Sequence, residues 1–570
     1  MFLLLIAAAW LVPNHYAPWT SAWSEAVAIS VLLMFALRTN ASTSSGGAVS
    51  LRLLGVAVLS ISMVTLQLIT GKEGFFGDAV MVFLYVSLWV MAALAGRHLA
   101  TTSTSTDMKT GLDTLEIALL FGAVLSVGVA LIQWTGAFSL GIYGAELPPG
   151  GRPFGNVAQP NHLCTICFLG LCGLFWLHQQ RRVHDAVFWL GATFLLLGMV
   201  MTQSRTGWLQ IGLLIAWALV MRVRAGLRIS RRQLLVLGGL FATGVAFWPV
   251  VCDFLLLSPG RSIGDQMQAG IRLPYWLSML DAIGREPLWG YGWQHIGAAQ
   301  QRVALDHPGV GILFEHSHNL VLDLLLWNGV PVGGFILVLL AWWFVAHVRC
   351  CRDARVVWLL LAVAGVFTHA MLEFPLEYAY FLIPVGLAMG AIDGLSPAGR
   401  ALTLPRWVVL SFTVLLSAIF MLTASEYLKA EENYRALRME SARIGVDRIE
   451  TPAPKLHLLT QLGAFLEFAR IEATPSMPPE QVEWMRKVSE RFGYPPVMFR
   501  YALAAGLNGQ PEISQQTLQR LCRIHGPQRC MEARDGWKAL QAQYPQLQDM
   551  RIDGGLAISS QREKLKPARN

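Results

Sequence analysis

The chain has 570 residues, of which 54% are hydrophobic and 14% are charged, and its formal net charge is +8. Soluble domains carry about 25% charged residues, so this composition excludes an ordinary soluble protein and indicates one solvated largely by lipid. The positive charge does not indicate nucleic-acid binding, because the Lys and Arg residues of the apolar part lie mostly in short loops between apolar segments.

Apolar segments of about membrane-crossing length recur from the N-terminus to about Thr423 and then stop. The first segment is short, and it lacks the basic start and small-residue cleavage site of a secretory signal sequence. We predict spans at approximately 1–12, 23–37, 53–70, 79–96, 113–134, 161–178, 186–202, 207–221, 233–250, 330–348, 356–372, 379–392 and 407–424.

Basic residues favour every second loop of this series. They are Arg38, Arg52, Arg97, Lys109, Arg181, Arg182, Arg222, Arg224, Arg228, Arg231, Arg232, Arg349, Arg352, Arg355, Arg400 and Arg406. The alternate short loops hold essentially Lys72, Arg152 and Arg205. By the positive-inside rule, we expect the first set of loops and the N-terminus in the cytoplasm, and the C-terminal tail outside.

Two long segments then lie outside the membrane. Residues 252–318 form the largest loop, and the tail from Ser425 reads as a soluble helical domain with an amphipathic stretch at 430–444. Residues 501–521 resemble one helical hairpin of a tetratricopeptide-like repeat. Cys522 and Cys530 could form a disulfide if the tail is periplasmic.

The predicted fold is therefore all-α. It is a polytopic transmembrane helical bundle of about 12–14 spans, with a large periplasmic loop and a C-terminal helical, tetratricopeptide-like periplasmic domain. We divide the chain into N-terminal transmembrane helices at 1–250, a periplasmic loop with a histidine-bearing helix at 251–329, C-terminal transmembrane helices at 330–424, a periplasmic helical domain at 425–557 and a disordered tail at 558–570.

Polar residues near the outer ends of the spans are the candidate functional residues, because polar groups in hydrocarbon are costly unless they are paired or face a wet cavity. All fall on the outer side that the basic residues define, as an active site at the membrane surface would require. They are Gln159, Asn161, His162, Gln203, Ser204, Arg205, Arg272, His316, Ser317, His318, Asn319, His369, Glu373 and Glu377.

Each residue also has a purely structural interpretation. Arg205 at a span end can be a snorkelling anchor. Asn161 can be a helix N-cap after a proline-restricted turn. Glu373 and Glu377 can satisfy His369 or one another at one-turn spacing.

The strongest local signal is His316-Ser317-His318-Asn319, followed by an apolar helix that reaches Gly329. A histidine at the mouth of such a helix can be neutral near pH 7 and accept a proton, as a general base must. Zinc ligands on one helical face are three or four residues apart, whereas His316 and His318 are two apart and no cysteine or carboxylate cluster accompanies them. We therefore predict no metal and no cofactor.

At these residues the sequence resembles the O-antigen ligase and polymerase superfamily, and more closely its protein O-oligosaccharyltransferase branch, often called PglL-type. The superfamily pattern is His, then Asn, Ser or Gln, nine residues, Gly, and a small residue or Tyr three positions further on. His318, Asn319 and Gly329 fit this pattern. Val332 departs from it, although Gly333 follows directly.

Other segments carry the same resemblance. Residues 151–156 leading into 159–162, and residues 373–378, are similar to signatures of the protein-glycosylating branch. Residues 204–207, Arg272 with Trp276, and residues 286–292 are similar to features of the wider superfamily.

The resemblance implies a glycosyltransferase of the bacterial inner membrane with its active site facing the periplasm. It would transfer a glycan from undecaprenyl diphosphate to a Ser or Thr hydroxyl of a pilin-like or other exported protein. The implied partners are this lipid-linked donor, the acceptor protein and the bilayer, without nucleic acid.

The resemblance and the chemistry of the residues together assign the site. His318 would take the proton of the acceptor hydroxyl, while Arg205 and Arg272 would stabilise the diphosphate leaving group. Direct displacement predicts inversion at the anomeric carbon. The substrate-binding candidates are Gln159, Asn161, His162, His316, Asn319, Glu373 and Glu377.

Two alternatives remain open. A sister activity would pass the glycan to lipid A core or polymerise repeat units, but the branch signatures and the helical tail favour a protein acceptor. A transporter or lipid flippase would place charges near the midplane, in broken helices and repeated halves. The sequence shows no such repeat, and its candidate charges gather at one face.

Overall fold

The computed structural model describes residues 2–42, 46–72, 74–102, 111–257, 270–398, 401–441, 452–548 and 550. Lys109, Arg400 and the predicted disordered tail at 558–570 lie outside the described residues. The chain forms two compact units. We call Met1–Gly270, Glu286–Trp293 and His316–Gly463 the membrane unit, and Ile271–Arg285, Gln294–Glu315 and Ala464–Asn570 the loop–tail unit.

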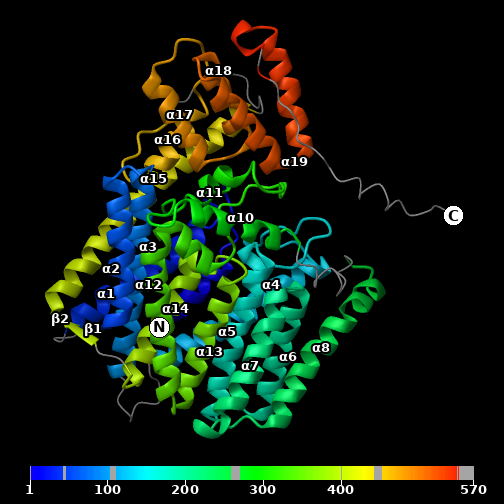
Figure 1. The fold of residues 1–570 in the computed structure, drawn as a ribbon. Helices are drawn as coiled ribbons and strands as arrows, with labels where there is room; N and C mark the ends of the chain where they lie inside the picture. The colour runs from blue at the N-terminus through cyan, green and yellow to red at the C-terminus, as the bar shows by residue number, and fades with distance from the viewer. Residues whose placement is uncertain are drawn as a thin grey trace. The chain divides into compact units, whose positions relative to one another are not determined.

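The membrane unit is almost entirely helical (Figure 1). Its elements are η1 (Phe2–Leu11), α1 (Ala22–Ser42), β1 (Gly47–Ser50), α2 (Leu51–Ile69), α3 (Phe76–Thr102), α4 (Gly111–Thr135), η2 (Gly141–Tyr143), η3 (Gly155–Val157), α5 (Pro160–Gln179), α6 (Asp185–Thr202), α7 (Arg205–Arg224), α8 (Arg231–Phe254), α12 (Leu320–Cys350), α13 (Ala354–Ala370), η4 (Pro375–Glu377), α14 (Ala379–Leu395), β2 (Ala401–Leu404) and α15 (Arg406–Ser441).

Among the described residues, ten helices are long and apolar enough to cross a membrane, and α13 and α14 are two shorter apolar helices. These twelve match twelve of the predicted spans, so the protein is a multi-pass membrane protein. The remaining segment, η1, is a 3₁₀ helix of ten residues. At about 2 Å per residue it is roughly 20 Å long, shorter than the ~30 Å hydrocarbon layer. A complete crossing by this segment therefore stays a prediction.

Two helices are longer than the predicted spans. Helix α12 begins at Leu320, ten residues before the predicted start, and is interrupted at Gly329, whose φ is +70°. Helix α15 has 36 residues, or roughly 54 Å, so it continues the last span into the region predicted as a separate soluble domain. The apolar helix predicted after Asn319 and the span predicted from 330 are therefore the two parts of α12. The length of α15 was underestimated because its C-terminal part is polar and continues no apolar run.

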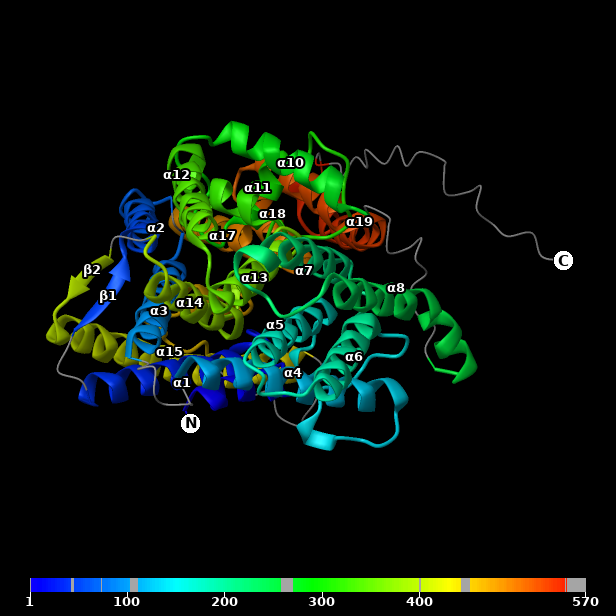
Figure 2. The ribbon, with the colours of Figure 1, turned by 90° about the horizontal axis from the view of Figure 1, so that it is seen from below.

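Basic loops that were predicted to share one side of the membrane contact one another. Strand β1 pairs antiparallel with β2, as the view in Figure 2 shows. Beside them, Arg52 Nη1 donates to the Ala398 carbonyl at 3.1 Å. Arg97 Nη1 donates to the Asp393 carbonyl at 2.7 Å. The loops that follow predicted spans two, four and twelve therefore meet at one end of the bundle.

Close backbone packing joins α3 to α14. A Cβ added at Gly390 would lie 1.9 Å from the Ala93 carbonyl oxygen, and one at Gly96 would lie 1.9 Å from the Leu387 carbonyl oxygen. Small residues allow helices in a membrane to approach this closely. Helices α8 and α15 are much less buried, and α8 lies at an edge of the membrane unit in Figures 1 and 2. These two helices are expected to face lipid.

The loop–tail unit combines part of the long loop with the C-terminal tail. Its elements are α10 (Arg272–Arg285), α11 (Ile296–Val303), α16 (Thr460–Phe468, from Ala464 onward), α17 (Pro479–Arg491), α18 (Pro495–Leu507), α19 (Pro511–Gln541) and η5 (Pro545–Leu547). Loop residue Ala304 shares a hydrophobic cluster with tail residues Met498, Leu521 and Ile524. Gln301 Nε2 donates to the Ser489 carbonyl at 3.1 Å. The loop and the tail are therefore one folded body.

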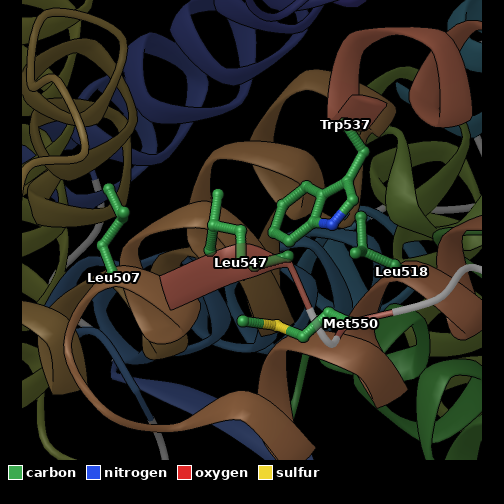
Figure 3. Close-up of a cluster of buried hydrophobic side chains, with 6 residues drawn as sticks. Leu507, Leu518, Trp537, Leu547 and Met550 are labelled. Carbon is green, nitrogen blue, oxygen red and sulfur yellow. The ribbon is translucent and has the colours of Figure 1, made fainter. Parts of the chain in front are cut away.

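The tail itself is organised around α18 and α19, which pack together as the predicted hairpin. Figure 3 shows its core, in which Trp537 lies among Leu507, Leu518, Leu547 and Met550. Cys522 and Cys530 are joined by a disulfide within α19. The likeness to a tetratricopeptide repeat stays a prediction.

Candidate functional site

His318 stands at the entrance to α12 in an unusual backbone conformation. Its φ is +57°, in the left-handed region that residues other than glycine rarely adopt. Its Nδ1 lies 2.9 Å from Glu373 Oε2, and the Glu373 side chain is only 8% exposed. Strained residues persist where the surrounding structure holds them, and they cluster at functional sites. This conformation therefore supports a functional role for His318.

The contact with Glu373 decides how His318 can act. An ionised carboxylate only accepts hydrogen bonds, so the neutral imidazole carries its proton on Nδ1 and donates it to Glu373. The lone pair is then on Nε2, the atom that can take a proton from a substrate. Glu373 would also stabilise the imidazolium that forms when it does so.

Two further hydrogen bonds connect Glu373 to the start of α7. Asn161 Nδ2 donates to Glu373 Oε1 at 3.0 Å, and Ser204 Oγ donates to Asn161 Oδ1 at 2.6 Å. Ser204 is the N-cap of α7, and Arg205 is the first residue of that helix. Residues at the starts of α5, α7 and α12 and in the turn before α14 thus form one continuous network. We call it the His318 relay, and its members are His318, Glu373, Asn161 and Ser204.

A second histidine–carboxylate pair lies beside the relay. His316 Nδ1 is 2.8 Å from Glu377 Oε1. The ring of Phe374 stacks on His316 with centroids 4.1 Å apart, and it meets His318 edge-on at 5.2 Å. In the turn from Glu373 to Glu377, each carboxylate therefore contacts one histidine, and the ring of Phe374 contacts both.

Deeper polar residues join the same helices. His162 Nδ1 lies 3.0 Å from the Tyr380 hydroxyl. His369 Nδ1 lies 2.8 Å from Thr165 Oγ1, and Gln210 Nε2 donates to that oxygen at 2.9 Å. Sequence reasoning missed Thr165, Gln210 and Tyr380 as site-supporting residues. Thr165 and Gln210 could have been found, because both are polar residues inside apolar spans.

The loop of residues 151–156 has a supporting role. Gln133 Oε1 accepts hydrogen bonds from the backbone of Phe154 and Gly155, at 3.3 and 2.9 Å. Arg152 Nη1 donates to the Thr202 carbonyl at 2.9 Å, immediately before Gln203, whose φ is +48°. This loop therefore fixes the turn from which Ser204 and Arg205 project.

The structure brings most of the predicted site residues together in the membrane unit. Asn161, His316, His318, Glu373 and Glu377 make the contacts described above. Gln159, rather than Asn161, is the N-cap of α5, because its side chain accepts from the His162 backbone at 3.0 Å. Asn319 is the N-cap of α12. Arg272 is the first residue of α10 in the loop–tail unit.

Comparisons with known proteins give two family matches and two relatives. Residues 188–339 match the family described as "O-Antigen ligase", and residues 356–539 match "Virulence factor membrane-bound polymerase, C-terminal". Over 538 residues the chain is 29% identical to the general O-oligosaccharyltransferase of Acinetobacter baylyi, covering 92% of this chain and 91% of that protein. Over 245 residues it is 31% identical to the ComP-specific O-oligosaccharyltransferase of the same organism, covering 43% and 44%.

The chain is thus similar to O-antigen ligases over residues 188–339 and to an oligosaccharyltransferase over most of its length. As an oligosaccharyltransferase it is a glycosyltransferase. The structure shows why the His318 pattern has a glycine at position 329. Gly329 has φ +70°, and a Cβ there would lie 2.3 Å from the Leu288 carbonyl oxygen. A glycine is required because α12 breaks at this point to admit another segment.

That segment is Glu286–Trp293, which belongs to the membrane unit. Tyr291 N donates to the Leu326 carbonyl and Val330 N donates to the Pro287 carbonyl, both at 2.7 Å. Gln67 Nε2, from the end of α2, donates to the carbonyls of Trp289 and Trp327 at 2.8 and 2.7 Å. Sequence reasoning missed Gln67, although a glutamine near the end of an apolar span was a usable signal.

Proposed function

We propose that this glycosyltransferase carries out O-linked protein glycosylation. It would move an oligosaccharide en bloc from undecaprenyl diphosphate to a Ser or Thr hydroxyl of an exported protein. The similarity to oligosaccharyltransferases along most of the chain supports this class of reaction. The observation that carries the proposal is the pairing of His318 with a buried Glu373 that is linked to the turn before Arg205.

His318 acts as the general base in this proposal. The acceptor hydroxyl gives its proton to Nε2 as its oxygen attacks the anomeric carbon, and Glu373 stabilises the resulting imidazolium. General-base catalysis of this kind contributes roughly 10² to 10⁴ in rate. Direct attack inverts the configuration at the anomeric carbon.

Arginine side chains stabilise the leaving group in the same step. As the bond from the anomeric carbon to oxygen breaks, negative charge develops on the lipid diphosphate. A guanidinium is permanently charged and can bind phosphate through two parallel hydrogen bonds. Arg205 and Arg272 are assigned this role, so the reaction is expected to proceed without a metal ion. The residues that orient the substrates or His318 in this proposal are Gln159, Asn161, His162, His316, Asn319, Glu373 and Glu377.

The proposed location is the bacterial inner membrane, with the His318 relay and the C-terminal tail on the periplasmic side. The support is the charge distribution, because the loops rich in arginine lie at the end of the spans opposite to the relay. A lipid-linked donor in the outer leaflet and an exported acceptor would both reach a site on this side.

A second candidate is transfer of the same glycan to lipid A core, favoured by the match of residues 188–339 to the family described as O-Antigen ligase.

The purified protein should be given the lipid-linked donor and, in separate reactions, a pilin or lipid A core, with and without a chelator. We expect glycan on the pilin in both conditions. Transfer to lipid A core alone would overturn the protein-acceptor proposal, and loss of transfer with the chelator would overturn the metal-independent mechanism.

A further inference from the structure

Helix α10 has two apolar faces of different kinds. One face packs into the loop–tail unit through buried residues that include Tyr275, Met279, Ala282 and Ile283. On the opposite face Leu273, Leu277 and Leu280 are 55%, 55% and 53% exposed. Spacings of four and three residues place these leucines on one stripe of the helix. A helix that faced water would carry polar residues there.

The charged residues of α10 leave this leucine stripe uninterrupted. Arg272 and Arg285 occupy the two ends of the helix. Asp281 is paired twice, with Arg285 at 2.7 Å and with His307 at 2.8 Å. Arg285 is also paired with Asp306 at 2.8 Å, so the cationic end of the helix is the one at Arg272. An apolar stripe with one cationic end suits a surface whose hydrocarbon is bordered by anionic headgroups.

The segment that follows α10 is fixed at the membrane boundary. Glu286, the next residue after α10, pairs with Lys72 at 3.3 Å. Lys72 lies three residues beyond Ile69, where membrane helix α2 ends. Trp289 accepts a hydrogen bond from Gln67 in the last turn of α2. The C-terminal end of α10 is therefore tethered at the level at which α2 leaves the hydrocarbon.

The exposed apolar surface continues along this tether. Leu288 is 66% exposed and Trp289 is 39% exposed, and both belong to the membrane unit. Tryptophan is enriched where proteins meet the boundary between hydrocarbon and headgroups. Exposed apolar side chains thus run along the chain from Leu273 to Trp289, as far as the segment that contacts the end of α2.

We propose that α10 is an interfacial helix whose leucine stripe lies in the outer edge of the bilayer hydrocarbon. Its opposite face stays packed on the loop–tail unit. The partner of this surface is the lipid bilayer itself, because the exposed apolar residues continue along the chain to Leu288 and Trp289, beside the end of membrane helix α2, and because the stripe begins at the cationic Arg272.

The position of α10 in the interface also sets the depth of Arg272, and the importance of that depth rests on the proposed function. Arg272 is the first residue of α10, so a helix lying in the interface holds its guanidinium at the depth of the headgroups. The diphosphate of a lipid-linked donor lies at the same depth. The leucine stripe would therefore set the height at which Arg272 meets its substrate.

Spin labelling tests the proposal without any need for catalysis. Cys350 is the exposed free cysteine and the other five free cysteines are buried, so Cys350→Ser gives a suitable background for labelling. A nitroxide would be attached at Leu277→Cys and, as a matched control, at Ile513→Cys, which is 43% exposed on α19. Collisions with oxygen, which partitions into lipid, and with a water-soluble nickel chelate would be measured in nanodiscs of phosphatidylethanolamine and phosphatidylglycerol.

We expect the Leu277 label to collide more often with oxygen than with the nickel chelate, and the Ile513 label to show the reverse. Equal access of the nickel chelate to both labels would overturn the proposal. Access that is lost only when an acceptor protein is added would also overturn it, and would assign the stripe to the acceptor. Because the measurement does not depend on glycan transfer, failure here is distinguishable from failure of the proposed function.

Discussion

His318 Nδ1 lies 2.9 Å from Glu373 Oε2, although 55 positions separate the two residues in the chain. The contact joins the start of α12 to the turn before α14, and Asn161 extends it to the start of α5. A base at the end of such a network has a fixed tautomer and orientation.

Glu373→Gln should lower the turnover of glycan transfer by about 10²-fold while changing the KM for the donor little. A carboxamide keeps the shape of the carboxylate but does not stabilise an imidazolium, so proton transfer to His318 suffers. The pH profile of turnover should shift as well, which loss of packing alone would not cause. Glu432→Gln, at an exposed ion pair on α15, is the matched control. An unchanged pH profile and rate for Glu373→Gln would show that His318 acts without this carboxylate.

Gly329→Ala should destabilise the membrane unit by about 1–3 kcal/mol, because an alanine there adopts a disfavoured positive φ and meets the Leu288 carbonyl. Thermal unfolding of the detergent-purified protein would measure the loss. Gly334→Ala is the control, since a Cβ at that position of α12 meets nothing within 4 Å. If the two variants unfold at the same temperature, the break in α12 does not depend on glycine.

Replacing Cys522 and Cys530 together by serine should destabilise the loop–tail unit by roughly 2–3 kcal/mol. The disulfide closes a short loop of the chain, with a sequence separation of 8, and so restricts the unfolded state. Hydrogen exchange should become faster in α19 and in the loop residues that pack on it. Exchange as slow as in the wild type would show that the hydrophobic core alone fixes α19.

His525 should make the stability of the loop–tail unit depend on pH. Burial lowers the pKa of His525 below its usual 6.5, and its Nε2 donates to the Gly493 carbonyl at 2.8 Å. The unfolded state therefore binds a proton more readily than the folded state, so the stability is complete above about pH 6.5 and declines as the pH falls toward the lowered pKa. The difference in unfolding temperature between wild type and His525→Gln, followed from pH 8 to pH 5, isolates this contribution. A difference that does not change with pH would contradict it.

Much of the membrane architecture could be predicted because its physical cause is local. Hydrophobic length located the helices α1 to α8 and α12 to α15. The basic residues put the loops that contain β1 and β2 on one side, but the two strands themselves were not predicted. Hydrophobicity did not reveal that η1 is a 3₁₀ helix of ten residues, because its composition is that of a span. Nor did it reveal that the helix after Asn319 and the span from 330 form one interrupted helix, α12, since the break depends on a segment packed from elsewhere in the chain.

The partners of the site residues were less predictable than their identities. Polar residues at span ends singled out His318, Glu373 and Asn161 as candidates. One-turn spacing suggested, as the structural alternative, that Glu373 and Glu377 satisfy His369 or one another. The structure instead pairs Glu373 with His318, because the turn before α14 packs against the entrance of α12. Contacts of this kind arise only from tertiary packing, so spacing in one sequence does not contain them.

Glycan transfer by purified His318→Ala, with donor binding measured in parallel, shows whether His318 is the general base. Transfer to a pilin should fall by roughly 10² to 10⁴ while the lipid-linked donor still binds, because the variant loses the base but keeps the arginines. Transfer at the wild-type rate by a variant that is folded and expressed equally would contradict this role.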